Sequence, residues 1–211
     1  MLVITLNVSA TLISARYEHE DKLDEYILSM LSLSTLSALL WWLGAQLFMD
    51  DVVGILNMNE KYVNSLFLYM MSIPAINLFQ TKEQFFYRYK ISVAISTLLA
   101  VGTSLLSVIL VVCSENGFAA RVLGYIVPYV AIGLLLCCYH LHKGKKITVK
   151  YWGEALKIVL PYIPHSLSLV MLSTIDRVMI TKLCGERETA LYSLAYTIAS
   201  IIVILLSTFN N

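Results

Sequence analysis

The sequence predicts an all-α protein, a polytopic membrane helix bundle with about seven transmembrane segments. Hydrophobic residues make up 58% of its 211 residues and charged residues only 14%, against roughly a quarter in soluble domains. The charged residues lie mostly in short connections between long apolar runs. Such runs cross the hydrocarbon core as helices, because lipid cannot satisfy free backbone groups.

Seven runs without Asp, Glu, Lys or Arg mark the predicted segments. The first is short for a span, and each of the other six is 18 residues or longer. The runs are residues 1–15, 26–49, 62–81, 91–114, 122–139, 158–175 and 189–211.

The longest basic connection divides the predicted bundle. Within residues 143–157 it holds Lys143, Lys145, Lys146 and Lys150, and we expect a boundary between two helical bundles there. Two interpretations of these lysines stay open. They could attract anionic lipid headgroups, or they could serve only to orient the chain in the membrane.

Lys and Arg counts in alternate connections predict the orientation. The set that includes residues 16–25, 82–90 and 140–157 holds ten, and the other set holds five. Cytoplasmic connections carry the excess of positive charge. We therefore expect residues 143–150 in the cytoplasm and residues 50–61 on the opposite side.

Two prolines interrupt an apolar segment at residues 160–168, LPYIPHSLS. Pro161 is compatible with a helix start, and Pro164 is expected to bend or break the helix. His165 then lies near that break, where ionisable groups usually face a cavity or a partner. It is either a neutral histidine hydrogen-bonded to a neighbouring helix or a residue with a substrate-linked or proton-linked role.

Asp176 and Arg177 lie at the predicted end of the same apolar segment. Adjacent residues do not face each other on a helix, so they need not pair. The planar fork of an arginine suits a phosphate. The alternative is an interfacial charge pair that ends the segment.

Motifs that carry covalent or metal chemistry are missing from the sequence. It shows no paired acidic motif, Gly-rich phosphate loop or nucleophile–base pattern. The four cysteines, Cys113, Cys137, Cys138 and Cys184, have no metal-ligand spacing. We therefore expect no cofactor, no metal site and no enzyme activity, and the net charge of +1 gives no reason to expect a nucleic-acid partner.

Six stretches of the sequence resemble bacterial polysaccharide flippases, the O-antigen and repeat-unit transporters of the polysaccharide transport family. In the second half of the chain they are LPYIPHSLS, IDRVMIT, Gly185 and YSLAYTIAS, in that order. In the first half they are TLNVSA at residues 5–10 and DKLDEYILSMLSLS at residues 21–34. The whole region of residues 160–200 and the two stretches in the first half together cover about a third of the chain.

The resemblance implies a place in a larger fold. Members of the family are about twice this length, with twelve to fourteen helices in two lobes, and belong to the multidrug/oligosaccharidyl-lipid/polysaccharide exporter superfamily. Residues 1–142 would be the remainder of the N-terminal lobe, 143–157 a cytoplasmic linker and 158–211 the start of the C-terminal lobe. We therefore expect the chain to be a fragment or truncated product that lacks independent transport.

The resemblance also implies a function. The family moves undecaprenyl-diphosphate-linked oligosaccharides from the cytoplasmic to the periplasmic leaflet of the bacterial inner membrane by alternating access, for O-antigen, lipopolysaccharide, capsule or exopolysaccharide assembly. Arg177, His165 and Asp176 match the family motif by position and are the candidate substrate-binding residues. Expected partners are the lipid-linked oligosaccharide and the bilayer, with a polysaccharide polymerase and a chain-length regulator as further candidates.

Three alternatives stay open. A drug or lipid II transporter of the same superfamily is the nearest. Carboxylates deep in a span would favour a cation-coupled drug antiporter, but every carboxylate here lies in a connection or at a segment end. A membrane-bound polymerase or glycosyltransferase would be expected to carry a large polar loop, and the longest connection here spans only residues 140–157. An inactive truncated remnant that merely inserts is the third.

Overall fold

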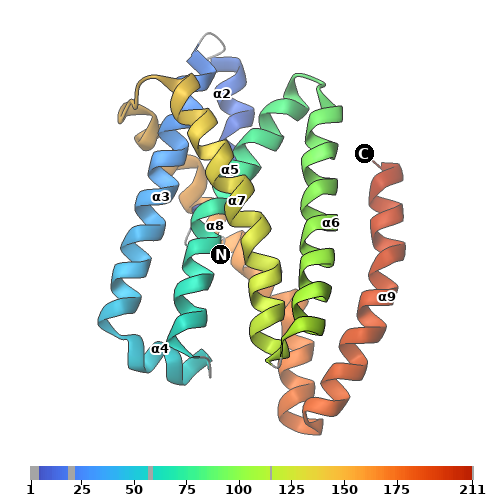
Figure 1. Cartoon of the computed structure of the whole chain (residues 1–211). Coiled ribbons are helices and arrows are strands. Elements are labelled where there is room, and N and C mark those ends of the chain that lie inside the picture. Colours follow the sequence, from blue (N-terminus) through green and yellow to red (C-terminus); the bar gives the residue numbers. More distant parts are fainter. Residues whose placement is uncertain (1–4, 19–21, 57–58, 115, 211) are drawn as a thin grey trace. The chain divides into compact units, whose positions relative to one another are not determined.

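The computed structural model describes residues 5–18, 22–56, 59–114 and 116–210, apart from the side chains of residues 16–18, 55, 56, 173 and 203–210. The described chain is helical and contains no strand (Figure 1), which confirms the predicted all-α class. Its elements are η1 (Val8–Thr11), α2 (Leu12–Glu18), α3 (Leu23–Leu47), α4 (Met49–Leu56), α5 (Glu60–Phe85), α6 (Tyr89–Cys113), α7 (Gly117–Gly144), α8 (Lys150–Cys184) and α9 (Glu186–Asn210).

Five stretches of helix in the described chain are long and apolar enough to cross a membrane. They are α3, α5, α6, α7 and the first part of α8, Lys150–Leu172. Each overlaps one of the predicted segments. The described part of the predicted segment 1–15 instead forms η1 and the start of α2, which are too short to span. The seventh predicted segment forms most of α9, which is not among these five spans.

Contacts divide the chain into two compact units, Met1–Ile163 and Pro164–Asn211, so the boundary falls within α8. The helices also extend into the predicted linker. Since α7 continues to Gly144 and α8 begins at Lys150, only residues 145–149 separate them. The predicted assignment of the chain to two lobes stays a prediction.

The start of α8 is fastened to α3 within the first unit. The backbone N–H of Thr148 donates to the Ser29 hydroxyl at 2.9 Å, and the Trp152 indole donates to the Ser29 carbonyl at 3.0 Å. The rings of Tyr26 and Tyr151 lie 5.3 Å apart between centroids. These contacts close a buried core that also includes Val8, Leu12, Ile27, Met30, Leu78 and Ala155.

Small residues bring α7 close to its neighbours. A Cβ added at Gly133 would lie 2.6 Å from Cβ of Ser72 on α5, and one at Gly124 would lie 2.4 Å from Cα of Ser107 on α6. Small residues at such contacts let membrane helices approach closely enough for van der Waals packing, which is a main source of attraction between helices in lipid. These contacts therefore hold α5, α6 and α7 together.

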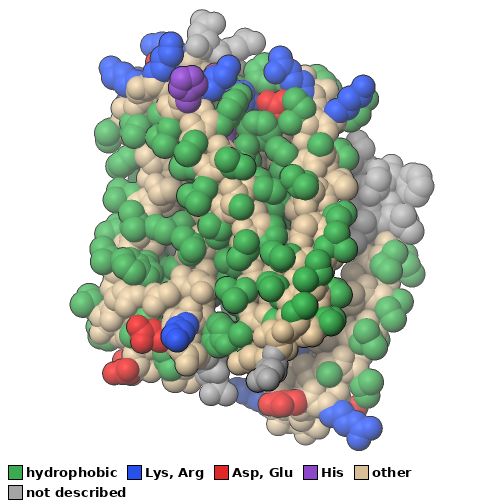
Figure 2. Space-filling view, viewed as in Figure 1, with side chains coloured by type: hydrophobic (Ala, Val, Ile, Leu, Met, Phe, Trp, Pro, Cys, Tyr) green, Lys and Arg blue, Asp and Glu red, His purple; other side chains and the backbone are tan. Residues whose placement is uncertain are grey.

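The outer surface of the first unit is apolar between two charged ends. Large aliphatic side chains of α6 and α7 are exposed, including Leu98, Leu105, Leu134 and Leu135. In Figure 2 hydrophobic side chains cover the middle of these helices, and Lys and Arg side chains gather at one end. A soluble surface would not expose so much contiguous apolar area, so this surface fits lipid.

The contact at Gly133 can be tested by adding one methyl group. We expect Gly133→Ala to lower stability by about 1–3 kcal/mol, because the methyl group would overlap Ser72. The measurement is the fraction of detergent-solubilised protein that stays monodisperse after heating. Gly44→Ala, on α3 with open space around its Cβ position, is the matched control and should be neutral or slightly stabilising. Equal behaviour of the two variants would contradict the packing described.

The predicted orientation can be tested by labelling single cysteines in a variant whose native cysteines are replaced by alanine. We expect a membrane-impermeant maleimide to label Asp51→Cys, on α4, from outside intact spheroplasts, but to label Lys145→Cys only after lysis. Both positions are exposed, so accessibility should report the side of the membrane. Labelling of position 145 but not 51 in intact spheroplasts would reverse the orientation.

Candidate functional site

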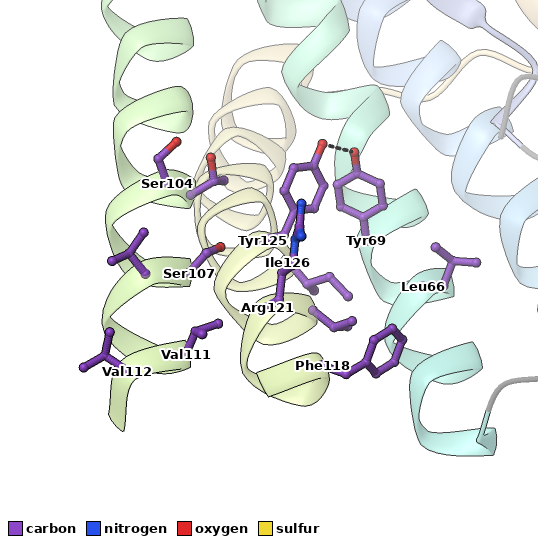
Figure 3. A pocket seen from close by; sticks show the side chains of 13 residues that line it. Leu66, Tyr69, Ser104, Ser107, Val111, Val112, Phe118, Arg121, Tyr125 and Ile126 are labelled. Atoms are coloured by element: carbon purple, nitrogen blue, oxygen red, sulfur yellow. Dashed lines mark hydrogen bonds between the residues drawn. The ribbon is translucent and has the colours of Figure 1, made fainter. Parts of the chain in front are cut away.

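An open groove of about 820 Å³ lies between α5, α6 and α7 of the first unit (Figure 3). Its walls combine aliphatic, aromatic, hydroxyl and cationic side chains. The lining residues are Leu66 and Tyr69 of α5; Thr103, Ser104, Ser107, Val108, Val111 and Val112 of α6; and Phe118, Arg121, Val122, Tyr125 and Ile126 of α7.

One side of the groove carries a strip of polar and aromatic groups. Arg121 and Tyr125 lie one turn apart on the same face of α7. The hydroxyl of Tyr125 lies 3.3 Å from that of Tyr69 on α5, within hydrogen-bond distance (Figure 3). Tyr129, one turn further along α7, does not line the groove but packs behind this strip, with its ring centroid 5.1 Å from that of Tyr69 and 5.2 Å from that of Tyr125. The strip therefore offers one guanidinium, aromatic faces and hydroxyl groups.

The α6 side of the groove combines valines with hydroxyl groups. Its apolar part consists of Val108, Val111 and Val112, and its hydroxyls belong to Thr103, Ser104 and Ser107. The close approach of Gly124 to Ser107 fixes the spacing of α6 and α7. A groove with an apolar wall and a polar strip can hold an amphiphile, with its chain on the valines and its head near Arg121.

The described lining of the groove offers hydroxyl groups, aromatic rings and one guanidinium. Its described lining includes no carboxylate, imidazole or thiol, and the described residues contain no group of three His, Cys, Asp or Glu placed to hold a metal ion. The lining groups can donate and accept hydrogen bonds and balance negative charge.

Asp176 and Arg177 lie elsewhere, in the second unit. Both lie beyond the apolar stretch of α8 that can span a membrane, Lys150–Leu172, but the helix itself continues past them to Cys184. The Tyr192 hydroxyl of α9 donates to Asp176 Oδ2 at 3.2 Å, and Arg177 Cζ lies 5.0 Å from the centroid of the Tyr196 ring. Both residues thus contact α9. Their predicted role in substrate binding stays a prediction, and these contacts give them a second, structural role.

The turn between α8 and α9 depends on Gly185. Its φ of +102° is one that residues with a Cβ rarely adopt. Its N–H lies 3.2 Å from the carbonyls of both Ile180 and Thr181, which satisfies groups at the end of α8. The hydroxyls of Thr181 and Thr189 lie 2.8 Å apart across the turn. The chain can therefore reverse tightly into α9.

His165 is exposed on α8. We predicted that the helix bends or breaks beside His165. α8 runs through both Pro161 and Pro164, so the helix does not end there. Pro164 removes one backbone donor, while the Ser168 hydroxyl donates to the Pro164 carbonyl at 2.9 Å. With a rise of 1.5 Å per residue, His165 lies about 18 Å from Arg177 along the helix. The structure thus separates His165 from the other two predicted residues, and its predicted role stays untested.

The predicted lipid-facing lysines all have exposed side chains. Lys143 lies in the last turn of α7, Lys145 and Lys146 lie in the connection, and Lys150 begins α8. Their attraction to lipid stays a prediction.

A four-residue spacing in the sequence indicates part of the groove, although these residues were not among the predicted site residues. Arg121, Tyr125 and Tyr129 recur every four residues, which places them on one face of a helix. Arg121 is one of the five Lys and Arg residues in the less basic set of connections, and no site was predicted around it. Tyr69, 56 residues before Tyr125 in the chain, joins them through the packing of α5 on α7, and no local pattern indicates that contact.

Long apolar helices around a partly polar groove define a multi-pass α-helical membrane protein. The model of one family, described as polysaccharide biosynthesis protein, matches residues 1–211, and the chain belongs to that family. The comparisons with curated proteins and with solved structures found no match.

The contacts of Arg177 lead to a prediction that separates its two roles. We expect Arg177→Ala and Tyr196→Leu to lower the amount of protein in the membrane alike, because each removes the same contact between α8 and α9. Surface polysaccharide per inserted molecule should stay normal in both variants. Immunoblots of membranes and glycan staining measure the two quantities.

A different pattern would support the predicted substrate role. Arg177→Ala would then lower polysaccharide per inserted molecule, Arg177→Lys would not restore it because lysine lacks the planar fork, and Tyr196→Leu would leave it unchanged.

Proposed function

We propose that this chain works as part of a flippase that moves undecaprenyl-diphosphate-linked oligosaccharide units across the bacterial inner membrane, for O-antigen, capsule or exopolysaccharide assembly. Membership of the polysaccharide biosynthesis family over residues 1–211 and five helices able to span a membrane support this proposal. The observation that carries it furthest is the groove with Arg121, Tyr69 and Tyr125 beside an apolar wall.

The substrate poses a solvation problem that this groove can reduce. A diphosphate and several sugars lose their hydration in hydrocarbon, and unpaired charges and hydroxyls there cost several kcal/mol each. Arg121 can offer a phosphate a two-pronged hydrogen bond. The hydroxyls of Tyr69, Tyr125 and Ser107 can exchange hydrogen bonds with sugars, while the polyprenyl chain stays on apolar side chains or in lipid.

The proposed mechanism is alternating access, in which two lobes open the polar path first to one leaflet and then to the other. No covalent bond forms or breaks. The lining residues act by binding the head group and releasing it. Binding with different affinities lets the substrate shift the balance between the two conformations, and net movement requires a lower free energy of the substrate in the leaflet that receives it.

The groove also bears on the alternatives. A polymerase or glycosyltransferase needs a general base that removes a proton from the accepting hydroxyl, and the described lining of the groove supplies no carboxylate or imidazole. Its mixture of one cation with hydroxyl and aromatic groups suits an anionic glycolipid better than a cationic drug. A lipid II transporter would use the same chemistry and differs only in the sugar carried.

Substitutions at the native locus test the proposed role of the groove. We expect Arg121→Gln to lower surface polysaccharide per inserted molecule about tenfold or more, because hydrogen bonds to charged groups contribute about 1.5–3 kcal/mol. Arg121→Lys should restore only part of the loss, since it keeps the charge without the fork. The measurement is glycan staining normalised to the protein in the membrane.

Lys61→Gln is the matched control. Lys61 is an exposed cation in the first turn of α5 that does not line the groove. The Lys61→Gln substitution should therefore leave surface polysaccharide per inserted molecule unchanged. Normal polysaccharide per inserted molecule in Arg121→Gln, or equal losses in Arg121→Gln and Lys61→Gln, would show that the groove does not take part in transport.

A further inference from the structure

A second hollow, of about 410 Å³, lies at the end of the first unit where three connections meet. The connections before α3, between α5 and α6, and after α7 all contribute to it. Its lining consists of Lys22, Leu23, Asp24, Glu25, Lys82, Phe86, Arg88, Lys143, Gly144 and Lys145.

Positive charge dominates this lining. Five of the lining side chains are cationic and two are acidic. Lys82, which is buried, forms an ion pair with Asp24 across α5 and α3. Lys22, Arg88, Lys143 and Lys145 are exposed to the hollow and to solvent. The described lining therefore keeps an excess of positive charge after that pair is formed.

Close packing fixes the backbone that carries Lys143 and Lys145. Gly144 packs tightly onto α3, since a Cβ there would lie 2.5 Å from Leu28 Cβ and 2.8 Å from the Asp24 carbonyl oxygen. The next residue, Lys145, has a φ of 53°, which turns the chain sharply as it leaves α7. Lys143 precedes Gly144 and Lys145 follows it, and both line the hollow. The hollow is thus built from packed helix ends.

The charges that orient the chain in the membrane do not need to converge on one hollow. The positive-inside rule needs Lys and Arg only near the ends of spans, and Lys146 and Lys150 satisfy it without lining the hollow. By contrast, cations from three separate connections surround one space, with the apolar side chains of Leu23 and Phe86 beside them. Figure 2 shows Lys and Arg side chains gathered at this end of the unit, next to the hydrophobic surface. Lipid headgroups lie at the ends of membrane spans.

We propose that this hollow, which we call the basic pocket, binds the phosphate of an anionic membrane lipid. Arg88 and the lysines would contact the phosphate oxygens, and the apolar side chains would contact the first carbons of the acyl chains. Basic pockets between membrane helices are suited to acidic lipid headgroups. The proposal does not depend on which substrate the protein transports.

Native mass spectrometry of the purified protein tests this, with phosphatidylglycerol and phosphatidylcholine as probes. We expect the unaltered protein to retain phosphatidylglycerol preferentially. The pair Arg88→Gln and Lys143→Gln should weaken that preference about tenfold or more, because each cation near a headgroup contributes to binding an anionic lipid. The pair Lys146→Gln and Lys150→Gln removes the same charge outside the pocket and should leave the preference nearly unchanged.

Further variants and a competitor distinguish binding in the pocket from a folding defect, from bulk electrostatic attraction and from a site for free phosphate. The charge-preserving pair Arg88→Lys and Lys143→Arg should keep the preference, which excludes a folding defect as the cause of the loss. Equal losses in the two glutamine pairs would show attraction to bulk charge and overturn the proposal. Complete displacement of phosphatidylglycerol by millimolar inorganic pyrophosphate would show a site for free phosphate and would also overturn it.

Discussion

The close approach of α7 to α5 and α6 determines the rest of the first unit. Inside a bilayer the hydrophobic effect does not drive helices together, so their contact depends on van der Waals packing and interhelical hydrogen bonds. Gly133 and Gly124 permit that packing because Ser72 and Ser107 occupy the space that a side chain would take. A larger residue at either glycine would separate two helices along their length.

This packing also places the chemistry of α7. Its first turns bring Arg121 and Tyr125 into the groove beside Tyr69, and its last turn brings Lys143 and Gly144 into the basic pocket. One helix therefore lines both hollows, near opposite ends of its span. A shift of α7 would change both hollows together. The polar groups are held by close helix contacts, as a binding site in an apolar bundle requires.

Much of the fold follows from the distribution of charge in the sequence. Long runs without charge predict helices, and five of the predicted segments overlap helices able to span a membrane. The ends of the helices were less predictable, because α7 and α8 continue past their apolar runs into the basic linker. Charged residues are good helix formers, so a charge marks the end of an apolar run without marking the end of the helix. Asp176 and Arg177 show this, since both lie inside α8.

The site was predictable only in part. The four-residue spacing of Arg121, Tyr125 and Tyr129 indicates one face of a helix, but the partner on α5 depends on a contact between residues 56 positions apart. The predicted break at Pro164 was wrong because neighbouring turns continue the helix around one lost donor. Convergence of the basic connections on one hollow is likewise a property of packing, which local sequence does not encode.

The side of the membrane on which lipid-linked oligosaccharide accumulates tests the central claim most directly. Depletion of the protein, followed by treatment of intact spheroplasts with a membrane-impermeant glycosidase, measures which leaflet holds it. A flippase predicts that the lipid-linked oligosaccharide accumulates and stays protected until the membrane is opened. Accumulation of accessible, unpolymerised oligosaccharide would indicate a polymerase, and failure to form the oligosaccharide would indicate a glycosyltransferase. Either result would contradict the proposed function.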